Sequence, residues 1–277
     1  MRLVINALTM GTIMCFSRGV PRHPFESAWI DLLSKSLRRY HGPSSRFLTT
    51  TSDVVPPANR LLQLVSLRNT YSVLRHGHSL ANQARIISSN PDVATIMHGL
   101  SPIGHEQAIA AADSVVEYFN NNDFDGIVIL SSDFLRATET AQHVSRRFSS
   151  NSSPSQMDNE SCMQLFLEPR LRERWFGAHD GGPDDQYSVV WKDDALDPNH
   201  TLSGVESVHS VMRRATECIL DCEQTHDNKF ILVVAHGDVL QILQTAFNKM
   251  DGSMHRSVEH LETATLRPLV LAVSGDQ

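Results

Sequence analysis

The chain has 277 residues, of which 41% are hydrophobic and 20% are charged, which is ordinary for a globular protein with one α/β domain and an extension. Its net charge of −7 is uneven: residues 1–60 hold eight Lys/Arg against three Asp/Glu, so they carry +5 and the remainder carries −12. A body this acidic is a poor electrostatic match for nucleic acid or an anionic membrane, and we expect neither as a partner.

Residues 1–58 are predicted to be an N-terminal extension, separated by the Val54–Pro57 linker from a catalytic domain at 59–277. The apolar run from Leu3 to Phe16 is too short for a membrane span, which needs ~20 residues, and no clear secretory cleavage site follows it. Arginines, few acids and an amphipathic stripe at helical spacing are typical of an organellar transit peptide. We therefore expect a mitochondrial or plastid protein, with a cytoplasmic extension or secretion as the alternatives.

Apolar strands alternate with helical patterns through the rest of the chain. Strands are predicted at residues 71–74, 126–130, 163–167, 230–234 and 269–273, and helices at 102–120, 135–148, 205–222 and 239–247. Ser101 is a good N-cap before Pro102. Residues 149–161 are predicted to be a surface loop, and residues 176–203, which lack a strong period, a loop that covers a site.

The four cysteines are too few and too scattered for a disulfide framework, which favours a reducing compartment. Cys218 and Cys222 lie four residues apart in a helical pattern. One helix face explains this spacing better than a metal site does.

This alternation predicts a three-layer α/β/α sandwich with a mostly parallel central sheet. Ligands of such sheets bind outside the carboxyl ends of the strands. Three polar clusters follow predicted strands, namely Arg75-His76-Gly77, Ser131-Ser132-Asp133 and His236-Gly237. We expect the topology to bring them together at one edge.

The residue types in these clusters suit phosphoryl transfer. Neutral imidazole can attack phosphorus, which makes His76 the candidate nucleophile. Arg75 and Arg136 would give bidentate donors to the phosphate oxygens, and for Arg136 the alternative is a solvated residue in the first turn of a helix. His236 is either a further donor to that phosphate or a core histidine.

A proton donor for the leaving oxygen is harder to identify. Glu173 stands between Arg172 and Arg174, so it could form an ordinary surface ion pair. Glu168 and Asp180 are competing candidates for the acid.

Five motifs in order resemble those of the histidine phosphatase superfamily, the phosphoglycerate mutase-like group. They are R-H-G-x-S-x-x-N at residues 75–82, L-S-P-x-G-x-x-Q-A at 100–108, S-x-x-x-R-A-x-x-T-A at 132–141, L-x-E-x-x-x-G at 171–177 and A-H-G at 235–237. Together they span most of residues 70–240. The resemblance implies a phosphoglycerate mutase-like fold.

The resemblance also implies a role for each matching residue. His76 would be the phosphorylated nucleophile, Glu173 the proton donor, and Asn82 a residue near the phosphate or substrate. The phosphate pocket would consist of Arg75, Arg136 and His236. The family usually has Glu where this chain has His78, which puts substrate contacts at that point in doubt.

The segment after Glu173 favours a phosphatase over a mutase. Family mutases carry a long basic insertion there, whereas here the only Lys or Arg between Gly177 and Val205 is Lys192. The segment instead contains Asp180, Asp184, Asp185, Asp193, Asp194 and Asp197. We expect a metal-independent phosphatase without a cofactor, acting on a small phosphorylated metabolite that lacks a second dense cluster of negative charge.

Three alternatives remain open. The first is a phosphoglycerate mutase-type phosphotransferase. The second is a barrel hydrolase that binds a metal through His76 and His78 with His236 and Asp238, a reading that gives Arg75 no role. The third is a weakly active relative that binds a phosphorylated ligand or a protein. The sequence indicates neither the oligomeric state nor the exact substrate.

Overall fold

The computed structural model describes residues 57–151 and 162–273. The predicted transit peptide and most of the predicted loop at 149–161 lie outside these residues. The boundary between extension and catalytic domain therefore stays a prediction. No helix among the described residues is long and apolar enough to cross a membrane.

A five-stranded sheet forms the centre of the described residues, in the order β3-β2-β4-β1-β5. Its strands are β1 (Thr70–Arg75), β2 (Ile127–Ser131), β3 (Met163–Leu167), β4 (Phe230–Ala235) and β5 (Leu266–Leu269). The first four are parallel, and β5 pairs antiparallel with β1. Every residue of β2 and β4 is buried, as expected for strands covered on both faces.

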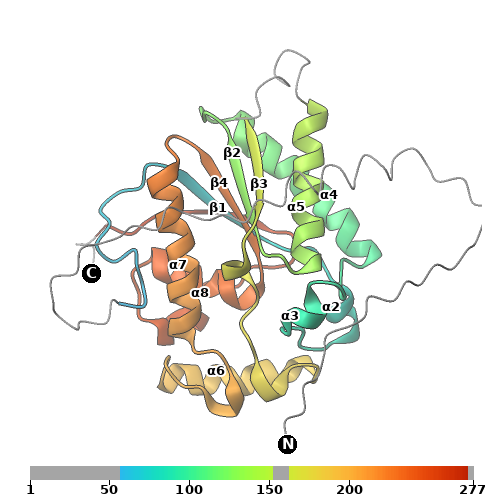
Figure 1. Cartoon of the computed structure of the whole chain (residues 1–277), viewed down its shortest axis with the longest axis vertical. Coiled ribbons are helices and arrows are strands. Elements are labelled where there is room, and N and C mark those ends of the chain that lie inside the picture. The colour runs from blue at the N-terminus through green and yellow to red at the C-terminus, as the bar shows by residue number, and fades with distance from the viewer. Residues whose placement is uncertain (1–56, 152–161, 274–277) are drawn as a thin grey trace, which may run out of the picture. The chain divides into compact units, whose positions relative to one another are not determined.

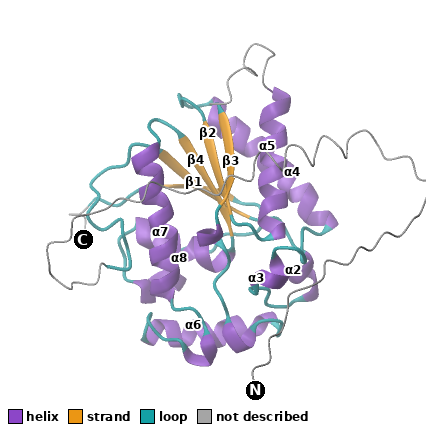
Figure 2. Ribbon diagram, viewed as in Figure 1, coloured by secondary structure: helices purple, strands orange, loops and turns teal. Residues whose placement is uncertain are grey.

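Helices cover both faces of this sheet (Figures 1 and 2). On one face α7 (Val208–Thr225) and α8 (Gly237–Phe247) pack in a core with alternate residues of β1, β2 and β4. On the other face α4 (Pro102–Asn120) and α5 (Leu135–Asn151) pack against the intervening residues. The predicted three-layer sandwich with a mostly parallel sheet is confirmed.

Most predicted elements are confirmed within a few residues. Ser101 accepts a hydrogen bond from the Gly104 amide and caps α4, as predicted. Helix α7 begins at Val208 rather than Val205, because Ser207 accepts a hydrogen bond from the Ser210 amide and is its N-cap. Two short helices, α2 (Leu80–Ala84) and α3 (Pro91–Ala94), were not predicted.

Cys218 and Cys222 lie buried together on the core face of α7, which confirms the helix-face interpretation.

The predicted last strand at 269–273 is wrong. Strand β5 lies at Leu266–Leu269 and includes Pro268. Proline is tolerated there because β5 is an edge strand. Val270 and Val273, in the predicted segment, are exposed.

Residues 176–203 are also not simply a loop, because they contain α6 (Tyr187–Leu196). This helix buries Val190 and Asp194, and the Asp194 carboxylate forms an ion pair of 2.6 Å with the fully buried Arg174 guanidinium. Because one of the two residues that α6 buries is an aspartate, the sequence of the helix shows no clear apolar period. The segment nevertheless covers the site, as predicted, since Tyr187 and Trp191 line the cavity described below.

Candidate active site

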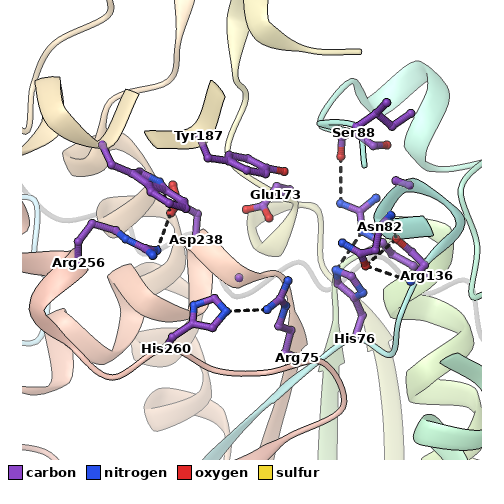
Figure 3. A pocket seen from close by; sticks show the side chains of 15 residues that line it. Arg75, His76, Asn82, Ser88, Arg136, Glu173, Tyr187, Asp238, Arg256 and His260 are labelled. Atoms are coloured by element: carbon purple, nitrogen blue, oxygen red, sulfur yellow. Dashed lines mark hydrogen bonds and ion pairs between the residues drawn. The ribbon is translucent and has the colours of Figure 1, made fainter. Parts of the chain in front are cut away.

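The polar clusters at the carboxyl ends of β1, β2 and β4 meet at one edge of the sheet, as predicted. A cavity of about 580 Å³ opens there, and its lining includes five of the six predicted site residues, namely Arg75, His76, Asn82, Arg136 and Glu173 (Figure 3). The sixth, His236, is fully buried and does not line the cavity, and its ring centroid lies 5.1 Å from that of His76.

His76 lines the cavity and is held as a neutral imidazole whose Nε2 carries no hydrogen. Its Nδ1 lies 2.7 Å from the Gly77 carbonyl oxygen, which only accepts, so Nδ1 carries the hydrogen. Its Nε2 accepts a hydrogen bond of 3.1 Å from Nε of Arg136. Burial and the nearby cations Arg136 and Arg75 hold the pKa of His76 well below its usual range. This is the protonation state and tautomer that a nucleophilic histidine needs.

The buried guanidinium of Arg136 and the partly buried guanidinium of Arg75 lie on either side of the His76 ring (Figure 3). Arg136 donates from Nη2 to the Ser88 carbonyl at 3.0 Å, and Arg75 donates from Nη1 to the Leu261 carbonyl at 2.8 Å. Nη1 of Arg136 and Nε of Arg75 are buried and have no hydrogen-bond partner among the described residues. Burial lowers the pKa of both arginines. Buried cations with unused donors are costly, so the site fits an anion.

Glu173 lines the cavity and is buried. Burial and the negative charge of Asp238 raise its pKa to about 7, against the effects of Arg136 and Arg75. One carboxylate oxygen accepts a hydrogen bond from the Arg174 amide at 3.0 Å. A carboxyl group with this pKa is substantially protonated near neutral pH and can give its proton to a leaving oxygen.

The alternatives for Glu173 do not hold, because its neighbours and competitors are engaged elsewhere. Arg172 pairs with Asp133 at 2.6 Å and Arg174 pairs with Asp194, so Glu173 forms no surface ion pair. Glu168 pairs with Arg170 at 2.7 Å.

Asp180, the other competitor, accepts hydrogen bonds from the amides of Ser89 and Asn90. Its carboxylate thus supports the chain beside the cavity and does not line it.

The side chains of His236 and Asn82 are each engaged with a serine next to the cavity. Nε2 of His236 lies 2.8 Å from Oγ of Ser132, while its Nδ1 is buried without a hydrogen-bond partner among the described residues. Burial and Arg136 lower its pKa. The carbonyl oxygen of Asn82 accepts from Ser79 and completes the cap of α2. Asn82 thus shapes the cavity wall as well as lining it.

The metal-binding interpretation finds no support. His78 does not line the cavity, and its Nδ1 lies 2.9 Å from Oγ of Ser101 at the start of α4. Among the described ranges no group of three or more His, Cys, Asp or Glu side chains could hold a metal ion.

Several cavity residues were not identified from the sequence. They are Ser88, Tyr187, Trp191, Arg256 and His260, and Asp238 was considered only as a metal ligand. Tyr187 and Trp191 lie on the unpredicted α6. Arg256 and His260 lie between α8 and β5, where the sequence has no recognisable motif. The residues just before Arg256 form no apolar pattern, so the sequence does not indicate that its side chain reaches the cavity.

The six aspartates of residues 177–205 do not line the cavity among the described residues. Asp184 pairs with Arg85 and Asp194 with Arg174. The acidity of this segment therefore does not set the charge of the cavity, contrary to the reasoning from sequence. The acidic residues that do line it are Glu173 and Asp238.

Comparison with known proteins agrees with this geometry. The family model of the histidine phosphatase superfamily (branch 1) matches residues 72–275. Over 210 residues the chain is 28% identical to the fructose-2,6-bisphosphatase TIGAR of Xenopus laevis, an alignment that covers 76% of this chain and 67% of that protein.

Solved structures show the same fold. A mycobacterial glucosyl-3-phosphoglycerate phosphatase is similar with a TM-score of 0.55 and 20% identity, over 72% of this chain and 88% of that chain. Bacillus stearothermophilus YhfR is similar with a TM-score of 0.55 and 21% identity, over 76% of this chain and 98% of that chain. The fold implied by the sequence motifs is confirmed.

The raised pKa of Glu173 predicts a pH-dependent loss of stability. The pKa rises from about 4.5 in the unfolded chain to about 7 in the fold, so the native state binds more protons between these values. Stability is therefore lost as pH rises through this window, by about 3 kcal/mol in full. We expect the Glu173→Gln variant to gain about 2–3 kcal/mol over the wild type between pH 5 and pH 8 in urea unfolding. An equal pH dependence of both proteins would contradict this.

Proposed function

The chain belongs to the histidine phosphatase superfamily (branch 1), and we propose that it is a phosphatase that hydrolyses a small phosphomonoester through a phosphohistidine on His76. One observation carries the proposal. The unprotonated Nε2 of His76 lies against a buried guanidinium with an unused N–H, in the same cavity as a carboxyl group whose pKa is raised to about 7.

The first step forms the phosphohistidine. Nε2 of His76 gives up its hydrogen bond from Arg136 and attacks phosphorus while the bond from phosphorus to the ester oxygen breaks, and Glu173 gives its proton to that leaving oxygen. The free donors of Arg75 and Arg136 stabilise the negative charge on the other phosphoryl oxygens. His236 stands behind the His76 ring and would add a further donor from the same side.

The second step releases phosphate to water. Glu173, now a carboxylate, accepts a proton from water as the water oxygen attacks phosphorus and the bond to Nε2 breaks. The products are inorganic phosphate and the resting enzyme, with neutral His76 and protonated Glu173. Neither step, as proposed, needs a metal or a cofactor.

Hydrolysis is favoured over transfer between two positions of a substrate. The Xenopus relative is named as a bisphosphatase, and the mycobacterial structure as a phosphatase. Lys192, the one lysine or arginine between Gly177 and Val205, is exposed and does not line the cavity. A phosphoglycerate mutase-type transferase is the alternative, and interconversion of 2- and 3-phosphoglycerate would reveal it. The convergence of the predicted catalytic residues speaks against a relative that only binds ligands.

His76→Ala is expected to abolish both turnover and covalent labelling. Rapid acid-free quenching of the wild type with a ³²P-labelled phosphate ester should trap a phosphohistidine, and the variant should trap none because the attacking nitrogen is gone. Wild-type turnover should persist in excess EDTA. His143→Ala, a change outside the cavity on α5, is the matched control and should keep activity and label. Full phosphatase activity in the His76→Ala protein would refute the mechanism.

Glu173→Gln is expected to discriminate between leaving groups. Turnover of alkyl phosphates, which need a proton, should fall by about 10²–10⁴-fold, and that of p-nitrophenyl phosphate much less. In the wild type, alkyl phosphate turnover should decline as pH rises through about 7, because the acid loses its proton there. Glu217→Gln, which removes the partner of Arg60 on the surface, is the control. Equal losses for both esters would assign the proton transfer to another group.

We also propose that residues 1–58 direct the protein to the mitochondrion or the plastid. The support is the basic and amphipathic character of this segment. It comes from the sequence alone, because the segment lies almost wholly outside the described residues. The full chain with a C-terminal fluorescent protein should localise to one of these organelles, whereas the chain lacking residues 1–58 should stay in the cytoplasm. Diffuse cytoplasmic fluorescence of the full chain would contradict this proposal.

A further inference from the structure

The cavity has a second end, away from the phosphate-binding side chains, which the proposed chemistry does not use. Figure 3 shows Arg256, Asp238 and His260 on one side of Glu173 and Tyr187, and His76, Arg136, Asn82 and Ser88 on the other. We call Trp191, Asp238, Arg256 and His260 the far end; all four line the same cavity as His76. A phosphate on His76 would therefore direct the rest of its ester toward this end.

The far end is fixed in place before any ligand binds. The Arg256 guanidinium stacks 3.6 Å from the ring centroid of Trp191, and Trp191 donates from Nε1 to Asp238 at 2.9 Å. Asp238 also accepts from Nη1 of the buried Arg174 at 3.3 Å. Nε2 of His260 lies 3.0 Å from Nη1 of Arg75, which links the two ends. A preorganised set of this kind is suited to recognition.

The charge of the cavity matches one phosphate group. Among the described residues its lining contains three guanidinium groups, on Arg75, Arg136 and Arg256, against the carboxylate of Asp238. With Glu173 protonated, the lining carries two positive charges in excess, which one phosphate dianion neutralises. Burial and Arg75 lower the pKa of His260, so it adds no charge near neutral pH. The Arg174–Asp194 ion pair behind the lining is neutral by itself.

A second anionic group would be unfavourable in this setting. It would leave a net negative charge in the cavity, beside Asp238, which is only 4% exposed. Arg256 is already counted in this balance, and Nη1 of its guanidinium lies 3.7 Å from Asp238 and donates to the Gln241 side chain.

Hydroxyl groups fit the same atoms well. The carboxylate of Asp238 only accepts hydrogen bonds and the guanidinium of Arg256 only donates them. A hydroxyl group does both, so it can donate to Asp238 and accept from Arg256 at once. A carboxylate or a phosphate dianion has no hydrogen to donate to Asp238 and would be repelled by its charge.

We propose that the far end recognises an uncharged, hydroxyl-bearing leaving group, so that the substrate class is a polyol or sugar monophosphate rather than a bisphosphate or a phosphorylated carboxylic acid. The inference rests on the proposed phosphatase function and narrows it. It also sets the expected substrate apart from the bisphosphate in the name of the Xenopus relative.

Matched substrate pairs test the proposal on the full chain. Glycerol 3-phosphate and 3-phosphoglycerate differ by a carboxylate, and fructose 6-phosphate and fructose 1,6-bisphosphate differ by a second phosphate. We call the first compound of each pair the uncharged member, because its leaving group carries no charge. We expect kcat/KM to favour this member by about tenfold or more, because a second negative charge close to Asp238 is repelled. Inhibition of p-nitrophenyl phosphate hydrolysis gives the same comparison for any compound that is turned over slowly.

Two substitutions should move this ratio in opposite directions. Asp238→Asn keeps the shape but removes the negative charge, so the preference for the uncharged member should shrink by about tenfold. Arg256→Gln removes a positive charge, so the preference should grow. Asp185→Asn removes an exposed aspartate that does not line the cavity, and should leave the ratio unchanged. Because each result is a ratio within one protein, a shared effect on Glu173 cancels.

The outcomes separate this inference from the proposed function. Lack of turnover of p-nitrophenyl phosphate and of all four esters would overturn the phosphatase assignment itself. Turnover of p-nitrophenyl phosphate with an equal or greater preference for the charged members would overturn the far-end proposal alone. So would a failure of both uncharged members to be hydrolysed or to inhibit.

Discussion

The hydrogen bond from Arg136 to His76 is the interaction on which the rest of the site depends. It places a permanent cation 3.1 Å from the nitrogen that must stay unprotonated, in a buried setting where a second cation, Arg75, lies nearby. A buried imidazole in this field does not gain a proton at neutral pH. Neither Arg136 nor Arg75 forms an ion pair with a carboxylate among the described residues. A phosphate dianion would neutralise these two positive charges.

Arg174 has the complementary task of organising the negative charges. Fully buried next to Glu173 in the chain, it pairs with Asp194 of α6 and contacts Asp238 of α8. It therefore fastens the covering helix to the core and fixes Asp238 beside Glu173, whose pKa that carboxylate helps to raise. Loss of one partner of this ion pair would leave an uncompensated buried charge, which costs far more than an exposed pair. Arg172 pairs with Asp133 and Arg174 pairs with Asp194. Among the residues that the structure describes, Glu173 is left without an ion pair because both neighbouring arginines are engaged elsewhere.

The features that the sequence predicted well are those with local signals. Buried strands that run directly into Arg75-His76-Gly77 and Ala235-His236-Gly237 are readable because apolar runs end abruptly in polar residues, and parallel topology then brings their ends together. Helix α6 was missed because its anchor is Asp194, whose burial depends on an arginine 20 residues away in the chain. Strand β5 was misplaced because an edge strand tolerates Arg267 and Pro268, which do not resemble a strand. Arg256 and His260 carried no signal, since only tertiary packing brings them to Arg75 and Trp191.

The two ends of the cavity are built from different parts of the fold. The reacting end consists of residues at strand ends and the starts of helices, where the sheet itself fixes their positions. The far end consists of residues from α6 and from the segment between α8 and β5, which the sheet constrains only indirectly. Asp238 belongs to both, because it follows β4 by three residues yet binds Trp191 and Arg174. A change at Asp238 therefore alters the proton donor and the leaving-group site together, whereas a change at Arg256 alters the leaving-group site alone. Substrate choice can thus vary at the far end while the phosphoryl-transfer chemistry at His76 is kept.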